Sequence, residues 1–194
     1  MAQAFDLLVS GGTVVTALGH DHADIGVRDG HIVEIGTLSR AETARKIDAT
    51  GLHVLPGIID SQVHFREPGN EHKEDLATGT AAAALGGVTA VFEMPNTKPS
   101  TTNADALADK VNRATGRAWT DFAFFVGATA ENAETLGALE TLPGCCGVKI
   151  FMGSSTGDLL VPDDETLERV LRNGTRRVAV HAEDEDRLIA RHGV

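Results

Sequence analysis

Short runs in which apolar and polar residues alternate fill the first fifty positions of the chain. Alternation with a period of two is typical of half-buried strands. The Asp29-Gly30 pair separates two of these runs and favours a hairpin turn. We therefore expect residues 1–53 to form a small antiparallel β unit. Its predicted strands cover residues 5–10, 13–16, 24–28 and 31–35.

The pattern changes after position 52, where apolar runs begin to alternate with longer amphipathic stretches. The first run, residues 52–59, predicts a buried strand. Strands that alternate with helices indicate right-handed crossovers and a parallel sheet, so residues 54–194 are expected to form an α/β domain. Further strands are predicted over residues 89–94, 121–126, 147–151 and 177–181, and helices over 75–85, 103–115, 131–140 and 163–172.

The strand count limits the architecture. Five parallel strands are predicted within 194 residues. A closed (β/α)₈ barrel needs eight strands and typically about 250 residues. We therefore expect either an open sheet or the first part of a larger barrel.

The composition disfavours some classes of binding partner. The chain has 28 acidic and 17 basic residues, a net charge of −11, which disfavours nucleic acid and anionic membranes. It has no run of 18 apolar residues, and its first residues lack the order of a secretory signal. We expect a cytoplasmic protein with a small-molecule substrate.

Polar residues suited to chemistry stand where the predicted strands end. They are His64 and Arg66, then Asn96, Lys149 and His181. The carboxyl ends of barrel strands meet at one mouth, so these residues are expected to become neighbours. Alternation along an extended chain would also point Gln62, His64 and Arg66 to the same face.

Two imidazoles and a lysine make a metal site plausible. A protonated lysine cannot bind a cation, but a lysine carboxylated by carbon dioxide is an anionic oxygen ligand that can bridge two ions. Bridged ions lower the pKa of the water between them and supply a nucleophile. Lys149 would be the lysine of such a site.

Structural roles for the same residues stay open. His64 could cap a strand while Arg66 pairs with Glu67 or Asp60. Lys149 could be an interior lysine paired with a carboxylate, or a neutral base. His181 and Gln62 could simply be hydrogen-bonded structure.

Several blocks of the sequence resemble dihydroorotase of the amidohydrolase superfamily. The order and spacing of the blocks span most of residues 5–190. They lie at residues 56–60, 64–69 (HFREPG), 74–79, 82–90, 94–97 (MPNT), 148–149 and 181–184.

The resemblance implies a fold and a set of roles. The fold would be an amidohydrolase-type (β/α)₈ TIM barrel, here incomplete, with residues 1–53 belonging to a small β-sandwich. His64 and His181 would bind zinc, one or two ions, and Lys149 would be the carboxylated bridging ligand. Arg66 and Asn96 would hold the carboxylate of the substrate. A further metal-binding histidine and a catalytic aspartate of the family have no counterpart in these 194 residues.

Gln62 departs from the family, which mostly has a histidine there. An amide oxygen is a weaker zinc ligand than imidazole, so the first metal position could be incompletely occupied.

Three functions are compatible with these features. The first is a zinc-dependent dihydroorotase of pyrimidine biosynthesis, which interconverts dihydroorotate and N-carbamoyl-L-aspartate, with the 194 residues alone expected to be inactive. The second is an amidase for another cyclic amide, such as a hydantoin or allantoin. Arg66 argues against it, because a buried guanidinium without a carboxylate partner would be costly. The third is a non-catalytic partner subunit, which Gln62 favours. We also expect a homo-oligomer, with aspartate carbamoyltransferase as a candidate partner.

Overall fold

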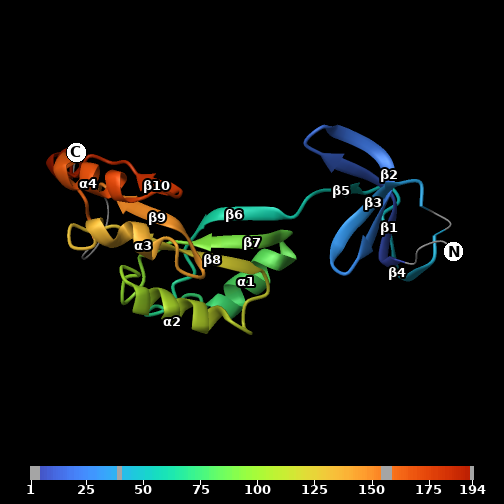
Figure 1. Cartoon of the computed structure of the whole chain (residues 1–194), viewed down its shortest axis with the longest axis horizontal. Coiled ribbons are helices and arrows are strands. Elements are labelled where there is room, and N and C mark those ends of the chain that lie inside the picture. Colours follow the sequence, from blue (N-terminus) through green and yellow to red (C-terminus); the bar gives the residue numbers. More distant parts are fainter. Residues whose placement is uncertain (1–4, 39–40, 154–158, 193–194) are drawn as a thin grey trace. The chain divides into compact units, whose positions relative to one another are not determined.

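The computed structural model describes residues 5–38, 41–153 and 159–192. The chain divides into two compact units, residues 1–56 and residues 57–194. Each unit contains its own five-stranded sheet (Figure 1).

The first unit is a mixed sheet rather than the expected antiparallel one. Its order is β3-β2-β1-β4, and both β4 and β5 pair with β1 in parallel. The predicted hairpin is confirmed, since Arg28 faces His31 and both Asp29 and Gly30 have positive φ, as a type I′ turn requires. Residues 5–16 form one strand with a register shift rather than two strands. The strands are β1 (Phe5–Thr16), β2 (Gly19–Arg28), β3 (His31–Gly36), β4 (Thr43–Asp48) and β5 (His53–Val54).

The second unit is a parallel sheet in the order β10-β9-β8-β7-β6, so successive strands are neighbours. This order agrees with the predicted strand and helix alternation. The strands are β6 (Ile58–Val63), β7 (Val88–Glu93), β8 (Asp121–Gly127), β9 (Cys145–Phe151) and β10 (Val178–His181). The helices are α1 (Leu76–Leu85), α2 (Ala104–Ala114), the short η1 (Ala133–Thr135) and α3 (Leu136–Leu139), α4 (Asp164–Asn173) and α5 (Glu185–Ala190).

The predicted strand over residues 52–59 is wrong in its position. Residues 53–54 pair with β1 in the first unit, and the strand of the second unit begins only at Ile58. Leu52, Leu55 and Ile59 are exposed by 59–65%, so the run is not buried either.

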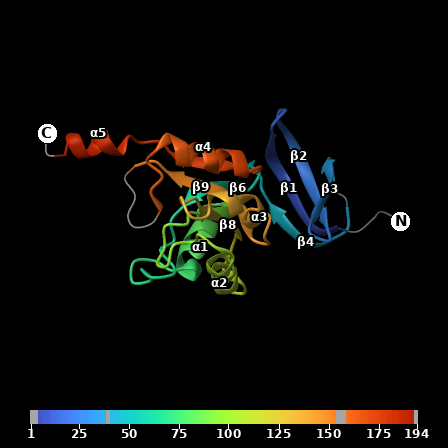
Figure 2. The same ribbon diagram turned by 60° about the vertical axis from the view of Figure 1, so that its left-hand side comes forward.

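Helices cover one face of the parallel sheet. α1 and α2 lie on the same side of it in both views (Figures 1 and 2). Side chains on a strand alternate between faces. Phe124 and Val126 of β8, with Val148 and Ile150 of β9, therefore face this layer and belong to the hydrophobic core with Leu107 of α2.

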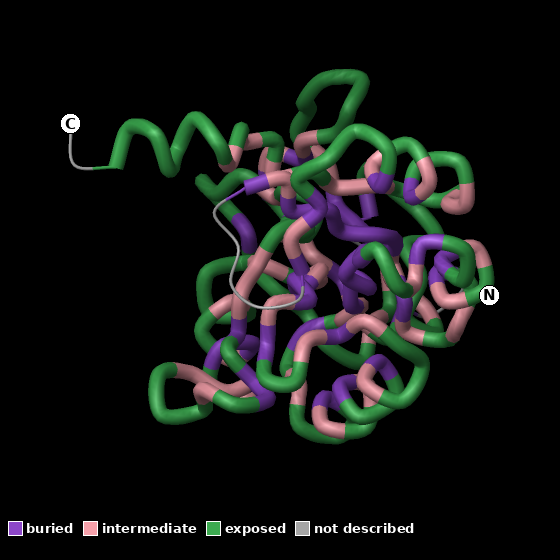
Figure 3. The backbone as a smooth tube through the Cα atoms, turned by 90° about the vertical axis from the view of Figure 1, so that its left-hand side faces the viewer, coloured by how far each residue is buried: buried purple, intermediate pink, exposed green. Residues whose placement is uncertain are grey.

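α2 and α4 begin within one residue of the predicted starts at 103 and 163. The side chain of Asn103 caps α2, and that of Asp163 caps α4, each by accepting a backbone N–H bond three residues on. α5 is capped in the same way by Asp184 but has no buried residue, and the chain is exposed from residue 186 to residue 192 (Figure 3).

Candidate active site

His64 and Asn96 meet at the carboxyl edge of the parallel sheet. His64 directly follows β6, and Asn96 lies in the segment after the neighbouring strand β7. Nδ1 of His64 lies 2.8 Å from Oδ1 of Asn96, and both residues are half-buried. The structure thus brings together two of the predicted site residues.

This contact determines which nitrogen of His64 is free. An amide oxygen only accepts, so Nδ1 carries the proton and Nε2 keeps its lone pair. Burial lowers the pKa of His64, and the charges of Arg66 and Lys149 lower it further, against the opposing effect of the Asn96 hydrogen bond. A neutral imidazole with a free Nε2 is the form that binds a metal ion.

Lys149 points away from the core helices, because its neighbours Val148 and Ile150 face them. It is only 2% exposed, and its Nζ lies 4.8 Å from the centre of the Phe151 ring. None of the described residues forms a hydrogen bond or ion pair with this Nζ. Burial lowers the pKa of Lys149. The amine is therefore biased toward its neutral, reactive form.

His181 ends β10 and pairs in register with Phe151 of β9. The two rings are 6.0 Å apart between centres, so Phe151 contacts both Lys149 and His181. Nε2 of His181 lies 2.9 Å from a carboxylate oxygen of Glu183. Because Glu183 contacts Nε2, Nδ1 is the ring nitrogen of His181 that this ion pair leaves open to a ligand.

The strand alternation that the sequence suggested for Gln62, His64 and Arg66 does not extend to Arg66. β6 ends at Val63, and Arg66 has a left-handed backbone with φ of 64°. Both side chains are exposed. The guanidinium of Arg66 has no hydrogen bond or ion pair with any described residue, so the expected alternative pairing with Glu67 or Asp60 is absent from this part of the chain.

A buried ion pair next to this edge was missed from the sequence. Nζ of Lys110 lies 2.7 Å from Glu93, donates to the carbonyl of Met94, and both charged side chains are 1% exposed. Burial raises the pKa of Glu93 and lowers that of Lys110. The signal was the position of Lys110 on the same helix face as Leu107 and Ala114. The pair holds the start of the segment that carries Asn96.

Within the described residues, no three histidine, cysteine or acidic side chains come together as a metal site. The predicted metal site would not form such a group, because one of its ligands is Lys149, which is neither histidine, cysteine nor an acidic residue. His64 with its free Nε2 and Lys149 with its unpaired amine fit a metal ion, whereas Gln62 is exposed on β6.

Comparisons with known proteins identify the family. The model of the dihydro-orotase-like family matches residues 51–143. Allantoinase from Rubrobacter xylanophilus is 42% identical over 188 residues, covering 93% of this chain and 40% of that protein. Dihydroorotase from Methanothermobacter thermautotrophicus is 39% identical over 166 residues, covering 84% and 36%. The solved structure of L-hydantoinase (dihydropyrimidinase) from Arthrobacter aurescens matches with a TM-score of 0.89 and 31% identity, covering 96% and 42%.

The chain belongs to the amidohydrolase superfamily. It corresponds to an N-terminal portion with dihydroorotase-like character. The fold expectation is confirmed, since the parallel sheet is that of an incomplete amidohydrolase barrel and the separate sheet is consistent with the N-terminal β-sandwich. The chain spans 40% of the length of the Rubrobacter relative.

The comparisons support a cyclic amidohydrolase but do not distinguish which cyclic amide is the substrate. Allantoinase, dihydroorotase and hydantoinase all appear among the similar proteins. The neutral-ring alternative, which the sequence argument disfavoured, is therefore comparably supported. Among the described helices, none combines the length and apolar character needed to cross a bilayer.

Proposed function

We propose that the protein carrying this chain is a zinc-dependent dihydroorotase, which opens the ring of dihydroorotate to N-carbamoyl-L-aspartate and closes it again. The observation that carries the proposal is the guanidinium of Arg66, which has no partner among the described residues and whose charge acts on His64, the residue bonded to Asn96. Dihydroorotate bears a carboxylate beside its cyclic amide. Guanidinium binds carboxylate through two parallel, charge-assisted hydrogen bonds.

His64, Lys149 and His181 are the residues that would hold zinc. Zinc bound there would supply Lewis acidity toward the ring carbonyl and a water of lowered pKa. His64 contributes a neutral ring whose orientation is fixed by Asn96. Lys149 contributes an amine that can take up carbon dioxide, because no described carboxylate neutralises it.

Asn96 would hydrogen-bond both His64 and the substrate carboxylate. Its Oδ1 accepts from His64, which leaves its amide N–H groups to donate to a substrate carboxylate beside Arg66. The proton for the leaving ring nitrogen would come from a group outside the described residues, in line with the catalytic aspartate that the family resemblance implies.

A neutral cyclic amide such as allantoin or a hydantoin is the second candidate. The allantoinase and hydantoinase similarities favour it. The objection that an unpartnered Arg66 would be costly does not hold for these residues, because the side chain is exposed. A non-catalytic partner subunit is favoured only by Gln62.

The substrate class can be tested with Arg66→Met in the complete protein. We expect kcat/KM for dihydroorotate to fall about 30- to 1000-fold, since a charge-assisted bidentate contact is lost, while zinc content stays the same. Arg169→Met, which removes an exposed arginine paired with Glu134, is the matched control. Equal turnover of dihydrouracil, which lacks the carboxylate, by the unaltered protein would refute the dihydroorotase proposal and favour the neutral rings.

A further inference from the structure

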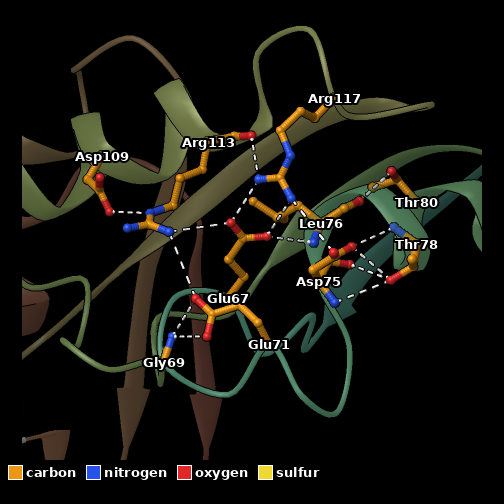
Figure 4. A network of polar contacts seen from close by, with 10 residues as sticks. All are labelled: Glu67, Gly69, Glu71, Asp75, Leu76, Thr78, Thr80, Asp109, Arg113 and Arg117. Atoms are coloured by element: carbon orange, nitrogen blue, oxygen red, sulfur yellow. Dashed lines mark hydrogen bonds and ion pairs between the residues drawn. The ribbon is translucent and has the colours of Figure 1, made fainter.

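Glu67 is a buried carboxylate with an unusually complete set of donors. It is 3% exposed and lies in the loop that follows β6 (Figure 4). Arg117 binds both of its oxygens, at 2.8 and 3.2 Å, and Arg113 lies at 3.4 Å. The backbone N–H of Leu76 donates to it at 2.9 Å. The fork from Arg117 is the geometry that holds a carboxylate most rigidly.

These donors come from two separate helices. Leu76 is the first residue of α1, while Arg113 belongs to α2 and Arg117 follows it. Both arginines are further restrained by other carboxylates, Asp109 at 2.6 Å from Arg113 and Asp75 at 3.8 Å from Arg117. Glu67 therefore fixes one point of the loop to the helical layer of the domain.

The adjacent residue is Arg66, whose backbone has φ of 64°. Left-handed backbone is unfavourable for a residue other than glycine, so surrounding contacts must hold it. The Arg66 carbonyl accepts from Asn70, and the Pro68 carbonyl accepts from Lys98, both at 2.9 Å. The second bond joins this loop to the segment after β7 that carries Asn96.

We infer that Glu67 is a positioning residue: by clamping its loop to α1 and α2, it holds Arg66 where the guanidinium can meet the substrate. The inference rests on the proposed function and deepens it. Glu67 itself does not touch the substrate. Its effect on recognition passes through Arg66.

The test is Glu67→Gln in the complete protein, which keeps the size of the side chain but removes its charge. For the cyclic amide that the unaltered protein opens best, we expect KM to rise about 10-fold or more with kcat changed less than about 3-fold. In an Arg66→Met background, the same substitution should change KM little, because coupled residues are not additive. Glu134→Gln, which alters an exposed carboxylate paired with Arg169, is the control.

A second readout does not depend on activity. Amide hydrogen exchange at Asn70 and Lys98 should quicken about 10-fold or more in Glu67→Gln, with α4 unchanged. If Glu67→Gln does not fold, Arg117→Lys, which keeps the cation but loses the fork, should shift both readouts in the same direction by less.

Unchanged exchange at these amides would overturn the inference, as would equal losses with and without Arg66. If the unaltered protein opens no cyclic amide, the proposed function fails. The exchange measurement then decides alone whether Glu67 holds the loop.

Discussion

Two lysines of the second unit are almost fully buried, yet their surroundings differ. Lys110 has Glu93 at 2.7 Å and the Met94 carbonyl at 3.0 Å. The Nζ of Lys149 lies 4.8 Å from the centre of the Phe151 ring and forms no hydrogen bond or ion pair with a described residue. Burial lowers the pKa of both amines, but only Lys149 has a nitrogen free to react with carbon dioxide.

We therefore predict that Lys149, and not Lys110, is carboxylated in the complete protein supplied with bicarbonate and zinc. The intact, zinc-loaded protein should gain the mass of one carbon dioxide under native conditions, and labelled bicarbonate should give a carbamate signal in NMR. Lys149→Ala should lower zinc affinity by more than the roughly 10- to 100-fold that follows loss of a supporting contact.

Lys110→Met provides a control, since its amine is held by Glu93 and its loss should leave the carbamate signal unchanged. A plain lysine at position 149 in the zinc-loaded protein would contradict the prediction. Full zinc content in Lys149→Ala would contradict it as well.

The sequence predicted the meeting of His64 with Asn96, and it could not have predicted the partners of Glu67. The first follows from topology alone, because neighbouring parallel strands end at one edge. Glu67 lies 46 positions from Arg113 and 50 positions from Arg117 in the sequence, and their contact depends on how α2 is rotated against the sheet. An arginine in the last turn of a helix and another just after it look like solvent-facing residues until the helix is placed.

At the scale of elements, most predicted strands and helices are confirmed with shifts of one or two residues. The error at residues 52–59 has a physical cause, since two short pieces with different partners read as one apolar run. β5 pairs with β1, and β6 pairs with β7. Pairing partners are set by tertiary contacts, and local hydrophobicity does not encode them.

Another buried carboxylate ties an element of the predicted site in place. Glu140, which follows α3, accepts from the backbone and hydroxyl of Thr175, both at 2.7 Å, and from the backbone of Arg176 at 3.0 Å. These residues lead into β10, which ends at His181. Burial alone would raise the pKa of Glu140, but the hydrogen bonds from Thr175 and Arg176 outweigh it and lower the pKa.

This shift fixes the pH dependence of its stabilising effect. A carboxyl whose pKa is lower in the folded state stabilises fully above its unfolded pKa of about 4.3, and the effect is lost as pH falls through the folded pKa. We predict that Glu140→Gln lowers the unfolding free energy by about 1–3 kcal/mol near pH 7. The difference from the unaltered protein should narrow below about pH 4.3.

Thermal unfolding of the complete protein across this pH range measures the effect. Glu168→Gln changes an exposed carboxylate of α4 and should leave stability nearly unchanged. A loss in Glu140→Gln that stayed constant down to acid pH would show that the charge of Glu140 is not responsible.

At the scale of the whole molecule, both the parallel sheet and the predicted metal site are incomplete within the described residues. Within the described residues, β6 and β10 are the edges of the parallel sheet, each with one neighbouring strand. A closed barrel of this family type has eight strands. The predicted donors Lys149 and His181 stand on this open sheet and His64 directly follows its strand β6, which is why the ligand set that the resemblance implies is only partly present here.

The open edges predict how the 194-residue chain behaves when it is produced alone. Ile58 and Ile59 on β6 are exposed by 56% and 59%, and Val180 on β10 by 44%. Exposed apolar edge strands pair with other chains. We therefore expect the isolated chain to self-associate at micromolar concentration and to open no cyclic amide, as measured by light scattering after size-exclusion chromatography and by ring-opening assays.

Charged residues on the two edge strands should distinguish edge-strand pairing from nonspecific association. Ile59→Lys with Val180→Lys should reduce the associated fraction several-fold, because lysine on an edge strand opposes pairing. Leu18→Lys is the matched control, since Leu18 is 100% exposed in the turn between β1 and β2 of the other sheet. Equal association of the edge variant and the control would place the contact elsewhere. A monodisperse, active monomer would show that five strands suffice for both folding and chemistry.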